Sequence, residues 1–283
     1  MSLEPCPGTL FLVGTPIGNL EDITARAIRI LQSVDLIAAE DTRHTAKLLH
    51  HFQITTPQIS HHQHNQAQRI PELIERLNQG QSLALVTDAG MPGISDPGAA
   101  LVRSCWQAEH TVVPIPGPTA AISALVASGL PTERFVFEGF LPIKGKARRQ
   151  RLEEIQSEPR TIVLYEAPHR LLATLMDLTT VLGGDRATTL ARELTKRHEE
   201  FWRGTLQGAC EYYQAIAPKG EFTLVIAGAE REQPQLSKAA LKTELQALIE
   251  QGLSRSQASR QLAHQTQLSR RELYQLALSL DEE

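Results

Sequence analysis

Three short loops rich in glycine and proline constrain the fold of this chain more than any other feature of its sequence. They cover residues 14–19, 88–98 and 114–120, and each follows a short apolar run that predicts a buried β-strand. Glycine and small polar residues let the backbone approach a ligand closely. Because loops at the carboxyl ends of successive strands meet at one edge of an α/β sheet, the sequence predicts one composite pocket at that edge.

The composition is that of an ordinary globular protein. Of the 283 residues, 41% are hydrophobic and 21% are charged. The sequence has neither an apolar run long enough to span a bilayer nor a basic amino terminus followed by an apolar stretch, so a cytoplasmic location is expected. Its three cysteines lie far apart and form neither a disulfide framework nor a metal-binding spacing. The formal net charge of −4 neither predicts nor excludes a nucleic acid partner, because binding depends on a local basic patch.

Strand and helix patterns alternate through residues 1–130, which predicts an N-terminal α/β domain with a mostly parallel sheet. Asp22 is expected to be the N-cap of the first helix. The expected strands cover residues 10–13, 34–39, 83–86 and 112–113, and the later helices cover residues 43–52, 70–79, 99–108 and 119–128.

The character of the chain changes near Pro131. In residues 131–230 the expected strands outnumber the expected helices, which predicts a second α/β domain with a mixed sheet. The expected strands are residues 135–141, 161–165, 188–192, 201–205 (an edge strand) and 222–228.

A polar linker at residues 231–235 leads to a helical segment, residues 236–283. Three helices are expected in it, at residues 241–250, 254–262 and 269–276, and the last two open with capping-box patterns. Their length suits either a helix-turn-helix or a small packing bundle.

Several motifs occur in an order that carries information about the family of the chain beyond their spacing. They resemble the tetrapyrrole-methylase superfamily and, within it, the bacterial small-subunit ribosomal RNA ribose 2′-O-methyltransferases. The motifs lie at residues 14–24, 39–43, 88–98, 116–120, 165–170 and 192–196, and the helical segment resembles the extra C-terminal segment of that branch. The second loop carries Asp88-Ala89-Gly90-Met91-Pro92 where general members have a Gly-Asp-Pro core, which matches the RNA-modifying branch.

This resemblance implies a fold of two α/β domains with S-adenosylmethionine bound in the cleft between them. Asp88 would offset the positive charge of this donor or accept a ribose hydrogen bond, although an Asp at this place also simply favours a turn. The positions that match the donor site of the superfamily are Ile17, Asp88, Ala89, Gly90, Met91, Thr119, Ala120, Leu164, Leu194 and Ala227.

Methyl transfer to a ribose hydroxyl is an in-line displacement, so alignment of oxygen, methyl carbon and sulfur supplies much of the rate. A base that takes the hydroxyl proton adds typically about 10² to 10⁴-fold. The sequence leaves the candidates open among Glu193, Lys196, Glu166, His169 and His198, each of which is equally compatible with a structural role. This chemistry requires no metal, and the run of histidines at residues 61–64 has no familiar metal-ligand spacing.

Basic clusters mark the expected RNA-binding surface. The alternative is a set of solvated helix faces in which these cations pair with neighbouring glutamates. The resemblance also places His64 and Asn65 near the substrate. The expected RNA-binding residues are His64, Asn65, Lys144, Lys146, Arg148, Arg149 and Arg197.

The resemblance therefore implies an S-adenosylmethionine-dependent enzyme that methylates the ribose 2′-hydroxyl of a cytidine in the decoding region of 16S ribosomal RNA. The resemblance implies a homodimer whose substrate is free 16S rRNA or the small ribosomal subunit. One alternative is a methyltransferase acting on a porphyrin-like small molecule. Another is a non-enzymatic RNA-binding protein led by the helical segment.

Overall fold

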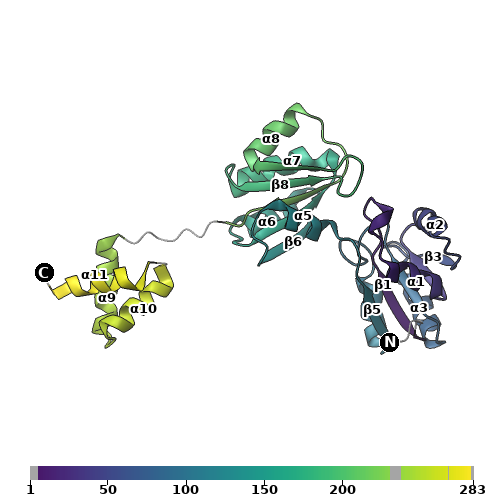
Figure 1. Cartoon of the computed structure of the whole chain (residues 1–283), viewed down its shortest axis with the longest axis horizontal. Helices are drawn as coiled ribbons and strands as arrows, with labels where there is room; N and C mark the ends of the chain where they lie inside the picture. Colours follow the sequence, from purple (N-terminus) through teal and green to yellow (C-terminus); the bar gives the residue numbers. More distant parts are fainter. Residues whose placement is uncertain (1–5, 230–236, 267, 282–283) are drawn as a thin grey trace. The chain divides into compact units, whose positions relative to one another are not determined.

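The computed structural model describes residues 6–229, 237–266 and 268–281, in two compact units, Met1–Ala229 and Glu230–Glu283 (Figure 1). The first unit has two five-stranded sheets with helices, and the second is helical. This confirms the expected α/β class with a C-terminal helical segment. The linker expected at residues 231–235 lies outside the described residues.

The first sheet is entirely parallel, as expected. Its strand order is β3-β2-β4-β1-β5. A three-residue strand, β3, was not expected, because so short a segment shows no usable periodicity. The strands are β1 (Thr9–Val13), β2 (Leu36–Ala39), β3 (Gln58–Ser60), β4 (Leu83–Val86) and β5 (Thr111–Ile115).

Helices cover both faces of this sheet. Leucine, isoleucine and alanine side chains of α1 (Ala25–Ser33) and α2 (Thr42–His51) form the core on one face, and those of α3 (Gln66–Asn78) and α4 (Ala99–Gln107) form it on the other. The expected cap was wrong: Asp22 lies in a 3-10 helix, Leu20–Asp22, and Thr24 caps α1 by accepting a hydrogen bond from the Ala27 N–H at 3.0 Å. The extra turn moves the start of α1 two residues later.

The second sheet is mixed, as expected, with the order β6-β7-β10-β8-β9. Only the β6–β7 pairing in it is parallel, and β9 lies at the edge. The strands are β6 (Phe135–Phe140), β7 (Thr161–Glu166), β8 (Ala187–Arg192), β9 (Glu200–Thr205) and β10 (Phe222–Ile226).

Four helices pack on this sheet. Buried side chains of α5 (Ala120–Ser128) contact one face, although α5 precedes the domain boundary predicted near Pro131. The other face is covered by α6 (Gly145–Gln156), α7 (Pro168–Leu182) and α8 (Leu206–Ala215). Consequently, the N-terminus of α5 follows the first sheet while its body belongs to the core of the second.

The second unit contains α9 (Lys238–Glu250), α10 (Arg255–Thr266), α11 (Arg270–Leu278) and a 3-10 turn, Ser279–Asp281. Leu245, Leu262 and Leu273 lie at its core. Both expected capping boxes are present: Ser254 pairs with Gln257, and Ser269 pairs with Glu272. Among the described residues, every helix is too short or too polar to cross a membrane.

Candidate active site

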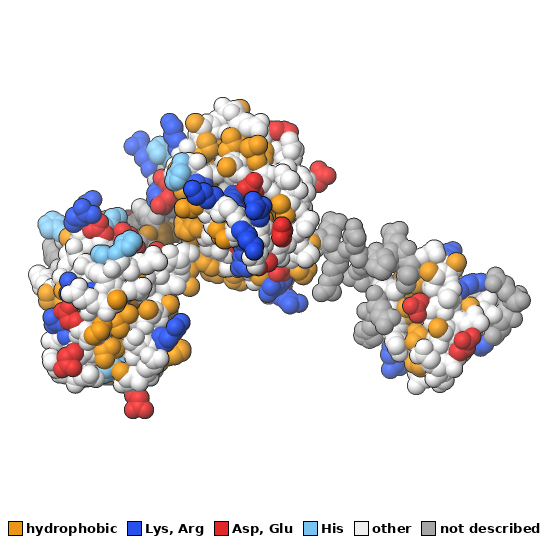
Figure 2. Space-filling view, turned by 180° about the vertical axis from the view of Figure 1, so that it is seen from behind, with side chains coloured by type: hydrophobic (Ala, Val, Ile, Leu, Met, Phe, Trp, Pro, Cys, Tyr) orange, Lys and Arg blue, Asp and Glu red, His pale blue; other side chains and the backbone are white. Residues whose placement is uncertain are grey.

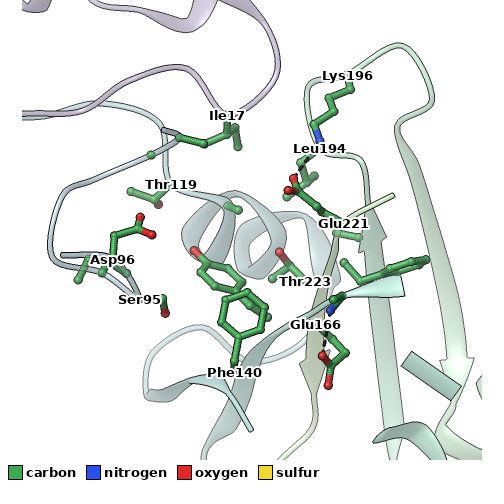
Figure 3. A pocket seen from close by; sticks show the side chains of 18 of the residues that line it. Ile17, Ser95, Asp96, Thr119, Phe140, Glu166, Leu194, Lys196, Glu221 and Thr223 are labelled. Carbon is green, nitrogen blue, oxygen red and sulfur yellow. Dashed lines mark hydrogen bonds and ion pairs between the residues drawn. The ribbon is translucent and has the colours of Figure 1, made fainter. Parts of the chain in front are cut away.

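A pocket of about 410 Å³ lies in the first unit, where the loops at the carboxyl ends of β1, β4 and β5 face the second sheet (Figure 3). This volume lies within the range of about 300 to 1,000 Å³ that is usual for small-ligand sites. Figure 3 shows Asp96 and Ser95 on one side of the pocket and Lys196, Glu221 and Thr223 on another, with Phe140 between them.

The first two loops are joined by backbone hydrogen bonds. The Thr15 N–H donates to the Gly90 carbonyl and the Gly90 N–H donates to the Thr15 carbonyl, both at 3.0 Å. The third loop approaches so closely that a Cβ on Gly14 would lie 2.8 Å from the Gly117 Cα and 2.7 Å from the Met91 sulfur. Glycine is therefore required at this junction, where the three loops meet.

The N-terminus of α5 opens into the pocket. Thr119 and Ala120 line the pocket, and the side chain of the N-cap residue Thr119 makes no capping hydrogen bond. The Ala121 N–H donates to the Tyr165 hydroxyl at 3.2 Å, which ties α5 to the second sheet. The remaining N–H groups and the helix dipole make this a suitable place for a carboxylate.

A group of carboxyl groups gathers beside the loops. Burial raises the pKa of Asp96 to about 7, and the nearby charges of Glu40 and Asp88 add to the effect. Burial also raises the pKa of Glu40. Asp88 itself accepts a hydrogen bond from the Asp41 N–H at 3.2 Å, which joins the loop after β4 to the loop after β2. Asp96 is the member of this group that lines the pocket.

Lys196 lies on the opposite side, between two carboxylates. Its Nζ is 2.9 Å from Glu193 Oε1 and 2.9 Å from Glu221 Oε2. Although burial opposes the effect, these two ion pairs raise the pKa of Lys196. Burial alone would raise the pKa of Glu193, but the hydrogen bond from the Glu221 N–H and the interaction with Lys196 outweigh it, so this pKa is lowered. Both groups therefore stay charged at neutral pH.

Glu166 is buried and its oxygens are already used. Oε1 accepts from the Ala167 N–H at 2.9 Å and lies 3.3 Å from Arg170, while Oε2 accepts from the Thr174 hydroxyl at 2.5 Å. Arg170 in turn donates to the Leu141 carbonyl at 2.6 Å. His169, which also lines the pocket, is exposed at the start of α7.

The pocket brings together most of the residues predicted to hold the donor. Ile17, Ala89, Gly90, Met91, Thr119, Ala120 and Leu194 all line it. Among the described residues, Asp88, Leu164 and Ala227 are outside this lining. The Leu164 side chain faces the core under α6 to α8, and the Ala227 N–H bonds to the Ala187 carbonyl at 2.9 Å. Of the predicted proton acceptors, Glu166, His169 and Lys196 line the pocket, whereas Glu193 contacts it through Lys196.

The residues predicted to bind RNA separate into two groups. His64, Lys144, Lys146, Arg149 and Arg197 are exposed. Arg148 is buried and donates to Asp177 at 2.7 Å, to the Pro142 carbonyl at 3.0 Å and to Thr174 at 3.0 Å. The Asn65 amide is used within its own loop, with bonds to Ser60 and to the His62 N–H. The structure thus gives Arg148 and Asn65 internal partners.

Sequence reasoning singled out neither Asp96 nor the aromatic side of the pocket. Asp96 lies in the second loop, but nothing in the sequence distinguishes it from Asp88. Phe140 was expected only as a strand residue, and Tyr165 as a strand residue at the start of the motif at residues 165–170, since their place in the pocket depends on pairing between β6 and β7. Glu221 and Thr223 reach the pocket because β10 lies between β7 and β8, an arrangement that periodicity does not reveal.

Comparison with known proteins places these features in a family. The family described as Tetrapyrrole (Corrin/Porphyrin) Methylases matches residues 9–210. A Synechocystis sp. protein named Ribosomal RNA small subunit methyltransferase I is 62% identical over 275 residues, 97% of this chain and 99% of that protein. A protein of the same name from Escherichia coli O157:H7 is 46% identical over 98% of this chain and 97% of its own length. A Thermotoga maritima protein of that name is 49% identical and is matched over 100% of its length by 79% of this chain.

Solved structures agree on the fold. Uroporphyrin-III-C-methyltransferase from Thermus thermophilus superimposes with a TM-score of 0.57 at 19% identity, covering 78% of this chain and 94% of that one. Diphthine synthase gives a TM-score of 0.59 at 15% identity, over 77% of this chain and 90% of that one. At such identities the likeness extends to the fold alone.

Proposed function

Because this chain belongs to the tetrapyrrole methylase family, together with the ribosomal RNA small subunit methyltransferases named above, we propose that it methylates small-subunit ribosomal RNA. The proposed reaction transfers a methyl group from S-adenosylmethionine to the ribose 2′-hydroxyl of a cytidine in the decoding region of 16S rRNA, which implies a cytoplasmic enzyme. The observation that carries this proposal is the near full-length identity of 46% to 62% with those methyltransferases, joined to an intact pocket. Relatives this similar do not favour a porphyrin-like acceptor.

The pocket fits S-adenosylmethionine chemically. The donor has a carboxylate, an ammonium group and a sulfonium, and when bound it supplies an activated methyl group. The N-terminus of α5, where the Thr119 side chain makes no capping hydrogen bond, suits the carboxylate. The pocket lining at Ala89, Gly90 and Ala120 offers backbone and small side chains that a flat ring can approach closely. Ile17 and Leu194 add apolar contact on either side.

We infer that Asp96 accepts the proton of the ribose hydroxyl. Among the carboxyl groups that line the pocket, Glu166 is held by Ala167, Arg170 and Thr174, and Glu221 is paired with Lys196. Asp96 has a pKa of about 7, raised by burial, which matches the pH at which it must exchange a proton. The hydroxyl proton moves to an Asp96 oxygen as the ribose oxygen bonds to the methyl carbon and the bond between that carbon and sulfur breaks.

Lys196, Glu193 and Glu166 act differently in this proposal. A lysine whose pKa is raised keeps its proton, so Lys196 contributes charge and orientation. Glu193 holds Lys196 in place at 2.9 Å. Glu166 orients Arg170, which fixes the segment after β6.

Exposed basic residues continue from the pocket onto the surface. Lys144, Lys146 and Arg149 follow the pocket residue Phe140 by a few positions, and Arg197 follows Lys196. Figure 2 shows Lys and Arg side chains gathered on the part of the first unit that carries the second sheet. We propose that these residues, with the exposed His64, contact RNA phosphates.

The test is transfer of labelled methyl from S-adenosylmethionine to small ribosomal subunits that lack the modification, with free 16S rRNA alongside and mapping of the product. The proposal expects one 2′-O-methylcytidine, and the comparison shows which form of the RNA is recognised. Methyl groups on a base, or transfer to a porphyrin-like acceptor only, would contradict it.

We further propose that the enzyme is a homodimer. Ile122 and Val126 on the outer side of α5 are 46% and 69% exposed, an apolar surface that a second copy would cover. Light scattering is expected to give about twice the chain mass of 31.2 kDa, and V126E is expected to give the single-chain value. A wild-type protein that runs as a monomer would contradict this part of the proposal.

A further inference from the structure

We infer that Phe140 is the platform on which the base of the target nucleotide stacks, so that its ribose is presented to Asp96. This inference rests on the proposed function, because it assigns a place in the same pocket to the RNA acceptor. The stacked base is the pyrimidine of the target nucleotide, turned out of its RNA strand. Enzymes that modify a single nucleotide require this exposure of the base.

An irregularity in β6 aims Phe140 at the pocket. In the pairing of β6 with β7, Phe137 is opposite Val163, Gly139 is opposite Leu164 and Phe140 is opposite Tyr165, with a register shift between Phe137 and Gly139. Side chains alternate along a regular strand, so without the shift Phe140 would lie on the face opposite Phe137. The extra residue moves Phe140 to the face of Val163 and Tyr165, and such bulges commonly redirect a side chain at a site.

Glycine is required at this bulge. Gly139 has a φ of +61°, which is the left-handed region, and a Cβ there would lie 3.0 Å from the Ser95 hydroxyl oxygen. The bulge therefore brings β6 directly against the loop that carries Asp96. Phe140 and Asp96 line the same pocket as a result.

The ring of Phe140 is held in place but left uncovered. It contacts Tyr165 at a centroid distance of 5.7 Å, and Tyr165 contacts Phe137 at 5.0 Å. The next two residues are fixed by arginines, since Arg170 donates to the Leu141 carbonyl at 2.6 Å and Arg148 donates to the Pro142 carbonyl at 3.0 Å. Nevertheless, Phe140 is 50% exposed. A rigid, exposed aromatic ring is what single-stranded nucleic acid uses as a stacking surface.

Phe140 also stands between the pocket and the basic surface. It lines a second hollow with Pro142 and with Ala147 and Arg151 of α6. Lys146 and Arg149 belong to the same helix, and Lys144 is its N-cap residue. A strand whose phosphates lie along α6 would bring one base over Phe140 and its ribose toward Asp96. Phosphate binding at α6, base stacking on Phe140 and proton transfer to Asp96 would thus follow one another along a single bound strand.

The test uses the full chain, unmodified small subunits and four variants. F140A is expected to lower kcat/KM for subunits by roughly 5- to 100-fold, the range for loss of one stacked base. F140Y is expected to stay within a few-fold of the wild type, and F140L to resemble F140A, because leucine is apolar but offers no ring. W106A is the matched control, since Trp106 is an aromatic residue that is 70% exposed on α4 and is not among the pocket residues.

Binding of S-adenosylhomocysteine, measured by calorimetry, separates this role from donor binding. Equal affinity in F140A and the wild type is expected. A loss of donor affinity as large as the loss of kcat/KM, or F140A and F140L at wild-type activity, would overturn the inference. A wild-type protein that fails to methylate subunits would instead overturn the proposed function, so the two failures are distinguishable.

Discussion

Two walls of the pocket are built on different principles. The loop wall (Ile17, Ala89, Gly90, Met91, Thr119 and Ala120) follows the strands of the first sheet and offers mostly backbone and small side chains. The side-chain wall (Asp96, Phe140, Tyr165, Lys196 and Glu221) offers a carboxyl group, two aromatic rings and an ion pair. A backbone wall recognises the shape of its ligand, whereas a wall of side chains carries out proton transfer and selects an acceptor.

Substitutions on the two walls are therefore expected to change different properties of the enzyme. On the loop wall, added atoms collide with fixed backbone, so donor binding is the property at risk. On the side-chain wall, the backbone tolerates a change of side chain, so turnover and acceptor recognition are at risk while donor binding persists. If the two walls act separately, a substitution on one wall changes its own property and leaves that of the other wall unchanged.

Asp96→Asn gives the largest expected effect. Loss of the proton acceptor is expected to lower kcat by about 10² to 10⁴-fold. In the wild type, kcat/KM is expected to rise with pH through a midpoint near 7, because the protonated carboxyl cannot accept a proton. This inflection should be absent in the variant. Initial rates with unmodified subunits between pH 5.5 and pH 9, at roughly half-unit steps, measure both.

The same variant has a stability signature. A carboxyl whose pKa is raised on folding stabilises the fold when protonated, and this contribution is lost as pH rises through about 7. Asparagine cannot ionise, so D96N is expected to unfold at a higher temperature than the wild type at pH 8, by a smaller margin at pH 5, and at a similar temperature below about pH 4, where the carboxyl is protonated in both the folded and the unfolded chain. D185N, a change at an exposed Asp after α7, is the control and should alter neither property. Unchanged rates in D96N would remove Asp96 from the mechanism.

Gly117→Val tests the loop wall. A Cβ at this position would lie 2.8 Å from the Gly14 Cα, so the two loops must separate. Overpacking of this kind costs typically about 1–3 kcal/mol, and we expect donor affinity to fall by roughly 5- to 100-fold. The control is G208A in α8, where a Cβ would come no closer than 3.4 Å to the neighbouring side chains and which does not line the pocket. Normal donor affinity in G117V would show that the junction is not needed for binding.

Arg148→Ala and Arg149→Ala separate structure from RNA contact at adjacent positions. R148A leaves the Pro142 carbonyl, Thr174 and Asp177 without their donor, so a loss of about 1–3 kcal/mol in the free energy of unfolding is expected. R149A is expected to leave stability within about 0.5 kcal/mol. It should instead reduce the salt dependence of RNA binding by about one unit of slope. Urea unfolding and binding at several salt concentrations measure the two effects, and identical behaviour of the two variants would contradict the assignment.

Removal of the second unit gives the smallest expected effect. All residues that line the pocket belong to the first unit, and the Thermotoga maritima relative is matched over its whole length by 79% of this chain. A chain ending at Ala229 is expected to bind S-adenosylhomocysteine within about twofold of the full chain, about 0.4 kcal/mol. Calorimetry of both proteins checks this. A donor affinity that collapses on truncation would show that the helical unit supports the pocket.

The sequence was most informative where local signals and the family motif agree. The parallel first sheet, the capping boxes at Ser254 and Ser269, and the pocket position of Gly90 and Thr119 follow from turns, caps and loops that short segments encode. The separation of Arg148 from Arg149 was not accessible, because it depends on which side of α6 packs against α7. Phe140 reaches the pocket through a bulge, and the pKa of Asp96 depends first on its burial and then on nearby charges, among them Glu40, which the loop after β2 brings close. Such features arise from tertiary structure alone.

The most direct test of the two-wall account is the affinity for S-adenosylhomocysteine of G117V and F140A, measured together by calorimetry. This product lacks only the sulfonium charge, so the comparison reports contact with the rest of the donor without the contribution of that charge. The account predicts a large loss of affinity in G117V and wild-type affinity in F140A. Equal losses in both variants, or a loss in F140A alone, would contradict the division of the pocket into a wall that binds the donor and a wall that receives the RNA.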